Sequence, residues 1–273
     1  MSYYSYAESR KNIVKNTSES IIEEIDILGF SLCENALTDA GVQELRGRLD
    51  DVWQKQVSEF GEKEIRGLGE WGQARAVLHY DRCFEGLILD PLVMDIVRAT
   101  VGEAAILHCM NGSISFPKED YSQSRWHRDF EKNFTSDKML SVNAFWILDE
   151  FNDQTGATWM VPHSHKLSYI PSDEYLKKHA VQICAKAGSL LFFDSKLYHR
   201  AGQNFSLKPR RAVNLQYTRP FLKQQIDFPS LFKGRIERET PLGRVLGLWS
   251  VPPKDLKEFR IAPLKRTYKP GEG

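Results

Sequence analysis

Residues 126–130, with the sequence WHRDF, carry side chains that suit a metal site. In an extended strand, successive side chains point to opposite faces, so His127 and Asp129 point the same way and Arg128 points away. An imidazole and a carboxylate on one face, joined by a distant histidine, make the metal site of non-haem iron(II) enzymes, which leaves coordination positions open. A His-x-Asp tripeptide is weak evidence by itself, so the prediction depends on the distant histidine.

His199 is a candidate for that distant histidine. Gly188 marks a turn before the apolar run 189–193, and His199 follows where this run meets a polar loop. A histidine at the end of a buried strand can reach a site between strands while its loop remains in water.

Arg210 and Arg211 begin the next strand pattern, and the alternation of side chains separates them. Arg211 shares its face with three apolar or aromatic residues, whereas Arg210 shares its face with Asn214 and Gln216. A cavity that binds a dicarboxylate needs a planar guanidinium on its polar side, where it can hold a carboxylate at two points. Arg210 is therefore the candidate anion-binding residue, and Arg211 is expected to be structural or at the surface.

The segment 139–148 shows the same division between two faces. One face is apolar and includes Trp146, whereas the other carries Ser141, Asn143 and Phe145 and would look into a barrel. Many such residues only fill space or satisfy backbone groups. Two strands with mostly polar inner faces are nevertheless expected of a barrel that encloses a ligand.

Short runs rich in β-branched and aromatic residues alternate with turn signals after residue 104. Their near-regular spacing favours a sandwich or barrel over βαβ units. The predicted strands are 105–116, 124–130, 139–149, 157–162, 181–184, 188–194 and 211–218. Helices are expected over 18–30, where a turn leads into a short strand, after the candidate cap Thr38, and over 91–101.

We therefore predict one domain over residues 1–273. N-terminal helices occupy 1–103, a β core occupies 104–218, and a C-terminal cover occupies 219–273.

The bulk composition narrows the class of protein. Of 273 residues, 41% are hydrophobic and 27% are charged, with a net charge of +1, which is typical of a globular protein and gives no basic surface for nucleic acid. No apolar run approaches the roughly 20 residues that span a bilayer, and the N-terminus does not resemble a signal peptide. The four cysteines lie far apart, as expected of reduced thiols. These features predict a cytoplasmic protein without nucleic-acid or membrane partners.

Taken together, the motifs resemble the phytanoyl-CoA dioxygenase superfamily of Fe(II)/2-oxoglutarate-dependent oxygenases, and partly its ectoine hydroxylase branch. The resemblance covers about 25–250, although Thr155 and His163 depart from the family's usual Asn and Gly. Residues 132–134 also lack a tryptophan of the ectoine branch, so ectoine is not carried over as substrate. The matching segments, in order, are ILGF at 27–30, WHRDF at 126–130, QTGA at 154–157, VPHSH at 161–165, FFDSKLYHRAGQN at 192–204, and Arg210.

The resemblance implies a fold and a set of site residues. The fold would be mainly β with flanking helices and a double-stranded β-helix core, also called a jelly-roll or cupin-like core. His127, Asp129 and His199 would bind Fe(II), and Arg210 would bind the far carboxylate of 2-oxoglutarate. Phe145 would lie beside this co-substrate, with Asn143 along the same face. By analogy with relatives, residues 222–250 would form a lid over the site. Many relatives have a hydroxyl group where this chain has Ala201, so one hydrogen bond to the co-substrate must come from another residue.

The resemblance also implies a reaction. O₂ and 2-oxoglutarate would be consumed, succinate and CO₂ released, and a small-molecule substrate oxidised, most often by hydroxylation. Halogenation is disfavoured because halogenases of this superfamily lack the carboxylate that Asp129 provides. Trp126, Phe130 and Trp146 are candidate substrate contacts, although Trp146 lies on the apolar face and equally suits the core.

Three alternatives remain open at this stage. A cupin-type metalloenzyme or isomerase would use His163 and His165, although their place after Pro162 in a turn favours a structural role. A non-catalytic small-molecule-binding protein could share the same fold. A nucleic-acid demethylase is disfavoured by the charge. The sequence leaves the substrate undefined and allows a monomer or a homodimer.

Overall fold

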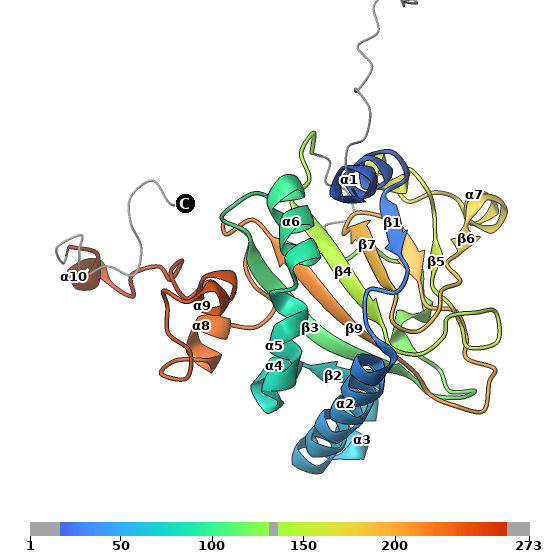
Figure 1. The fold of residues 1–273 in the computed structure, drawn as a ribbon, viewed down its shortest axis with the longest axis horizontal. Helices are drawn as coiled ribbons and strands as arrows, with labels where there is room; N and C mark the ends of the chain where they lie inside the picture. The colour runs from blue at the N-terminus through green and yellow to red at the C-terminus, as the bar shows by residue number, and fades with distance from the viewer. Residues whose placement is uncertain (1–16, 131–135, 261–273) are drawn as a thin grey trace, which may run out of the picture.

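Two antiparallel β-sheets form the centre of the computed structural model, which describes residues 17–130 and 136–260 (Figure 1). The larger sheet has the strand order β1-β7-β4-β9-β3-β2, and the smaller has the order β6-β5-β8. The strands are β1 Phe30–Cys33, β2 Gln73–Arg75, β3 Ile106–Ser115, β4 Ser141–Ile147, β5 Trp159–Met160, β6 Val181–Gln182, β7 Leu190–Asp194, β8 His199–Arg200 and β9 Arg210–Thr218.

Helices surround the sheets and are concentrated at the two ends of the chain (Figure 1). None of the described helices is long and apolar enough to cross a membrane. The helices are α1 Thr17–Leu28, α2 Asp39–Phe60, α3 Glu62–Gly67, α4 Val77–Tyr80, α5 Glu85–Ile88, α6 Pro91–Thr100, α7 Asp173–His179, α8 Phe228–Leu231, α9 Pro241–Val245 and α10 Leu256–Phe259, with 3₁₀ turns at Arg82–Phe84, Ser122–Ser124 and Ser164–Lys166.

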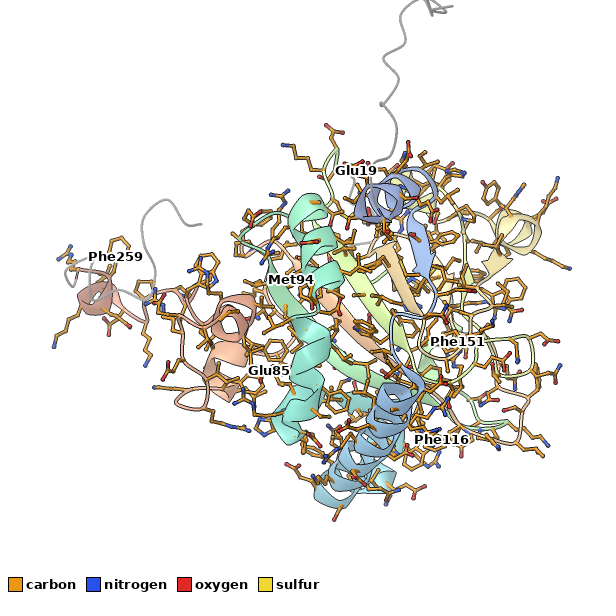
Figure 2. The ribbon with its side chains drawn as sticks, in the orientation of Figure 1. Glu19, Glu85, Met94, Phe116, Phe151 and Phe259 are labelled. Carbon is orange, nitrogen blue, oxygen red and sulfur yellow. The ribbon has the colours of Figure 1, made fainter. Side chains whose placement is uncertain are left out.

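The main hydrophobic core lies between the larger sheet and its covering helices. Apolar side chains of α1, α2 and α6 pack against alternate residues of β4 and β9, and side chains fill the space between these layers (Figure 2). Gly112 of β3 allows α2 to approach closely, because a Cβ at this position would lie 2.2 Å from Leu49 Cδ1. Buried residues in this core include Ile25, Leu49, Ile96, Val142, Trp146, Val213, Leu215 and Tyr217.

A second hydrophobic cluster lies on the opposite face of the larger sheet. It joins Leu191 and Phe193 of β7 to Met160 of the smaller sheet and to Phe151 in the connecting loop. The two sheets therefore face each other across this cluster, and the alternate residues of β4, β7 and β9 are divided between two cores. The predicted mainly β fold with flanking helices is confirmed.

Three parts of the structure differ from the sequence prediction. Residues 124–130 form no strand and instead make one isolated bridge, at His127. Strand β2, at one edge of the larger sheet, was not expected, because three residues are too short to show an alternating pattern. The candidate lid 222–250 packs largely into the main core through residues such as Phe228 and Leu242, whereas its Gln225 lines the cavity.

Thr38 begins α2 as expected, and its hydroxyl accepts a hydrogen bond from Gly41 N at 3.2 Å. We predict that Thr38→Ala lowers the free energy of unfolding by about 1 kcal/mol, because a helix N-terminal amide loses its partner. Urea denaturation measures this loss. Thr38→Ser keeps the hydroxyl and should remain close to wild type, whereas equal losses in both variants would contradict the capping role.

Candidate metal centre

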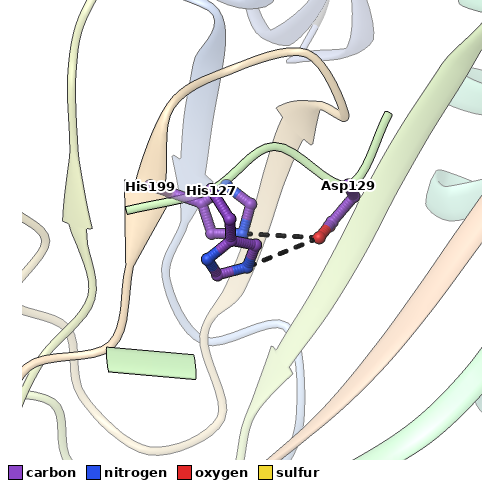
Figure 3. Close-up of side chains that lie close together, drawn as sticks. All are labelled: His127, Asp129 and His199. Atoms are coloured by element: carbon purple, nitrogen blue, oxygen red, sulfur yellow. Dashed lines mark ion pairs between the residues drawn. The ribbon is translucent and has the colours of Figure 1, made fainter. Parts of the chain in front are cut away.

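His127, Asp129 and His199 form one cluster whose ligand atoms all lie within 4.8 Å of one another (Figure 3). Asp129 Oδ1 lies 3.6 Å from His127 Nε2 and 3.7 Å from His199 Nε2. One ion can bridge these pairs, because two metal–ligand bonds of about 2 Å each span up to about 4 Å. The structure therefore brings together the three residues that the sequence selected, in the arrangement of a two-histidine, one-carboxylate site.

Backbone pairing holds the three side chains in place. His127 N donates to His199 O, and His199 N donates to His127 O, each at 3.0 Å. Asp129 N donates to Ser195 O at 3.0 Å, in the turn that follows β7. The segment around residue 127 is thus attached to β8 on one side and to the end of β7 on the other.

Hydrogen bonds also fix which nitrogen of each histidine faces the cluster. His127 Nδ1 lies 2.7 Å from Arg125 O, and His199 Nδ1 lies 2.9 Å from Leu197 O. Since a carbonyl oxygen only accepts, each Nδ1 donates to its carbonyl, and each Nε2 is the ring nitrogen that faces Asp129. This is the second contact that metal-binding histidines generally make.

Burial of His199 has a further consequence for its charge. Desolvation lowers the pKa of His199 to about 4, although the nearby Asp129 carboxylate opposes this shift. The imidazole is consequently neutral near pH 7, which is the form in which histidine binds metals.

Asn143 was predicted to lie beside the co-substrate, but it does not line the cavity. It instead contacts the carboxylate of Asp129. Its Nδ2 donates to Asp129 Oδ2 at 2.8 Å and to Asn214 Oδ1 at 3.0 Å, while Ser195 Oγ donates to Asn143 Oδ1. The second carboxylate oxygen, Asp129 Oδ1, is left facing the two imidazoles. Asn143 therefore orients Asp129, which corrects its predicted role.

A cavity of about 290 Å³ opens beside the cluster, between the two sheets. The three clustered residues, Phe145 and Arg210 all line it. Phe145 of β4 and Asn214 and Gln216 of β9 therefore line the cavity, as predicted from the alternation of side chains.

Arg210 is a buried cation with an incomplete set of partners. It is 2% exposed, and its guanidinium packs 4.4 Å from the Phe151 ring and donates to Gly156 O. Its Nε has no hydrogen-bond partner, and no described carboxylate lies within ion-pair distance. Burial lowers the pKa of Arg210 to about 10. A buried guanidinium in this state favours an anionic ligand from the cavity.

Arg211 points to the other side of β9, as the alternation predicted. It forms ion pairs with Asp50 of α2 at 2.7 Å and with Asp149 at 3.0 Å. Its role is to attach α2 to the sheet.

The three candidate substrate contacts do not line the cavity. Trp146 is 1% exposed and belongs to the main core, so its prediction as a substrate contact is wrong. Trp126 packs beside the small cluster of Val161, Leu176 and Tyr198. Phe130 lies next to the segment 131–135, which is outside the described residues.

His163 and His165 lie outside the metal cluster. His163 Nδ1 binds Ile27 O at 2.7 Å, and His165 Nε2 lies 3.4 Å from Asp26 O, at the end of α1. His163 has φ +65°, a left-handed conformation that favours glycine. Within the described part of the chain, these contacts give both histidines a structural role.

Several residues that line the cavity were not predicted from the sequence. Gln73 and Arg75 come from the short strand β2, Tyr121 from a loop, and Gln225 from the C-terminal segment. None of these positions belongs to an alternating pattern long enough to assign a face. Within the predicted strand 105–116, alternation places Asn111 and Ser113 on one face, and their polarity could have suggested that this face lines the cavity. His108 falls on the opposite face by alternation, so its position could not be predicted.

A mainly β fold with this histidine and carboxylate cluster defines the class of non-haem iron oxygenases. The sequence profile described as phytanoyl-CoA dioxygenase (PhyH) matches residues 27–212, which is more than half of the chain. The chain therefore belongs to the phytanoyl-CoA dioxygenase family. The prediction of Fe(II), 2-oxoglutarate and O₂ as metal and co-substrates is confirmed by this membership together with the cluster.

Two relatives illustrate the range of similarity. An uncharacterized protein of Mycobacterium tuberculosis is 36% identical over 269 residues, covering 96% of this chain and 98% of that protein. An ectoine dioxygenase of Bordetella bronchiseptica is 26% identical over 227 residues, covering 69% of this chain and 71% of that protein. The partial similarity to ectoine enzymes is therefore confirmed.

Solved structures share the fold at low sequence identity. SnoK, an alpha-ketoglutarate-dependent carbocyclase from nogalamycin biosynthesis, has a TM-score of 0.59 at 18% identity and covers 75% of this chain and 85% of that chain. HygX of Streptomyces hygroscopicus, with nickel and 2-oxoglutarate bound, has a TM-score of 0.57 at 14% identity and covers 75% and 88%. The predicted jelly-roll core is confirmed.

The contact between Asn143 and Asp129 leads to a prediction about metal affinity. Asn143→Ala should weaken Fe(II) binding by roughly 10- to 100-fold, because loss of a partner behind a ligand has effects of this size. Anaerobic Fe(II) titration measures the affinity, and Gln154→Ala, an exposed amide in a loop, serves as the control. Unchanged affinity in a folded Asn143→Ala protein would contradict the orienting role.

Proposed function

We propose that this protein is an Fe(II)/2-oxoglutarate-dependent dioxygenase that hydroxylates a small molecule, with the iron bound by His127, Asp129 and His199. The observation that carries the proposal is the meeting of these three ligand atoms at the wall of a cavity that also contains Arg210. Both Nε2 atoms and one carboxylate oxygen are directed at a common point, while hydrogen bonds hold their far sides.

Arg210 is proposed to bind the far carboxylate of 2-oxoglutarate. Its guanidinium is buried, lacks an acidic partner among the described residues and faces the cavity, so an incoming carboxylate would supply the missing contact. Ala201 lines the same wall without a hydroxyl group. Thr158, which also lines the cavity, is proposed to supply the hydroxyl hydrogen bond that Ala201 lacks.

The chain's own contribution is to position and enclose the reactants. Bound iron and 2-oxoglutarate supply the oxidising chemistry with O₂, which releases succinate and CO₂. Phe145 and Phe193 line the cavity as apolar surfaces that exclude water from the space beside the cluster. Asn143 holds the carboxylate, and the backbone bridge between His127 and His199 fixes the distance between the imidazoles.

Hydroxylation is proposed in preference to halogenation because of Asp129. Its carboxylate oxygen lies beside both imidazoles, so it would bind the iron where a halogenase needs room for a halide. We further propose that the chain forms one catalytic domain over 1–273, acts in the cytoplasm as a monomer or homodimer, and uses no nucleic-acid or membrane partner.

The adjacent arginines provide a matched test. Arg210→Met should raise the KM for 2-oxoglutarate by roughly 30-fold or more, because a buried charge pair contributes about 2 kcal/mol or more. Arg211→Met removes the same charge one residue later, on the opposite face, and should change this KM by less than about threefold. The measurement is Fe(II)-dependent formation of succinate from 2-oxoglutarate in the presence of O₂.

Two outcomes of this assay would contradict the proposal. Wild-type protein that forms no succinate with Fe(II), 2-oxoglutarate and O₂ would contradict the proposed reaction. Equal effects of Arg210→Met and Arg211→Met would remove the assignment of Arg210 as the co-substrate anchor.

A further inference from the structure

The part of the cavity that continues beyond the metal cluster and Arg210 is lined mainly by neutral hydrogen-bonding side chains. Amides come from three strands of the larger sheet, from the 3₁₀ turn Ser122–Ser124 and from the segment after β9. They are Gln73 of β2, Asn111 of β3, Asn214 and Gln216 of β9, Gln123 of the turn, and Gln225. No leucine, isoleucine or valine lines the cavity, among the residues that the structure describes.

A β-bulge increases the polarity of this wall. The register between β3 and β9 shifts between Leu107 and Cys109, so His108 is the extra residue. Leu107 and Met110 face the main core, whereas both His108 and Cys109 line the cavity. Bulges of this kind redirect side chains next to active sites.

The charges on this wall are already balanced. Arg75 binds Glu70 through Nε at 3.2 Å and through a terminal nitrogen at 2.7 Å, and its other terminal nitrogen lies 3.0 Å from the Asn111 amide. Burial lowers the pKa of His108, so this imidazole is neutral near pH 7. Asp129 is the lining carboxylate, and it belongs to the metal cluster. Neither an anion nor a cation would find an uncommitted opposite charge here.

The size of the cavity also limits which substrate can bind. About 290 Å³ must hold 2-oxoglutarate as well as the reacting part of the substrate, at the lower end of the roughly 300–1,000 Å³ of ligand sites. The lining amides already have a partner each, as Gln73 has in Tyr121 and Gln216 in Ser141, but a side-chain amide offers two N–H groups and two acceptor positions. An acyl chain would leave the remaining donor and acceptor positions unfilled. Hydroxyl groups both donate and accept, so they match amides, which carry one donor group and one acceptor.

We propose, on the basis of the proposed function, that the substrate is a small uncharged molecule with several hydroxyl groups, of the size and polarity of a monosaccharide or cyclitol. Asn111, Gln216 and Gln225 bind its hydroxyl groups and select it against acyl chains and charged molecules. Asn111 Nδ2 donates to Gln225 Oε1 at 3.1 Å, so the two amides lie side by side and one hydroxyl group can contact both.

The test is calorimetric titration of the anaerobic protein with Fe(II) and 2-oxoglutarate bound. The probes are myo-inositol and methyl α-D-glucopyranoside as neutral polyols, with octanoyl-CoA, 3-phosphoglycerate and choline as acyl, anionic and cationic probes. We expect at least one polyol to bind with a millimolar or lower Kd, and the other three to bind at least tenfold more weakly. Asn111→Leu should weaken polyol binding about tenfold, whereas Gln43→Leu, on the exposed side of α2, should have no effect.

The outcomes separate this inference from the proposed function. Binding of 2-oxoglutarate without binding of either polyol at tens of millimolar would overturn the inference alone, as would tighter binding of any of the other three probes. Polyol binding that Asn111→Leu and Gln43→Leu affect equally would also overturn it. Failure of wild-type protein to bind 2-oxoglutarate would overturn the proposed function, and this inference with it.

Discussion

Two backbone hydrogen bonds between His127 and His199 connect parts of the chain that are 72 positions apart, and the metal cluster depends on them. Together with the hydrogen bond from Asp129 N to Ser195 O, this bridge holds His127 and Asp129 near His199. The bridge also attaches this segment to the smaller sheet, which forms the wall opposite β4 and β9. The same two hydrogen bonds therefore stabilise both the metal cluster and the wall of the cavity.

One face of the larger sheet packs in the main core, and the other face lines the cavity. Residues such as Val213 and Leu215 of β9 stabilise the main core against the helices, while Arg210 and Asn214 of the same strand line the cavity. A shift of one residue in the register of β9 would place Arg210 in the apolar core and Arg211 in the cavity. Pairing of β9 with both β3 and β4 along most of its length prevents such a shift.

The sequence predicted the features that depend on alternation in long strands. It selected Arg210 over Arg211, placed Phe145 on the inner face of β4, and paired His127 with Asp129. It could not predict that Asn143 reaches Asp129, because alternation gives the face of a residue and not its nearest neighbour. Short or irregular segments, such as β2 and the bulge at His108, carry no periodic signal. Residues 124–130 were predicted as a strand because an extended chain and a strand share the same side-chain alternation.

The most direct test of the account is anaerobic titration with Fe(II) and 2-oxoglutarate, followed through the weak visible charge-transfer band of an iron-chelated 2-oxo acid. Wild-type protein should show this band, and His127→Ala, Asp129→Ala and His199→Ala should each lose it. Absence of the band in folded wild-type protein, or its full retention in His199→Ala, would contradict the assignment of these three residues as the iron ligands.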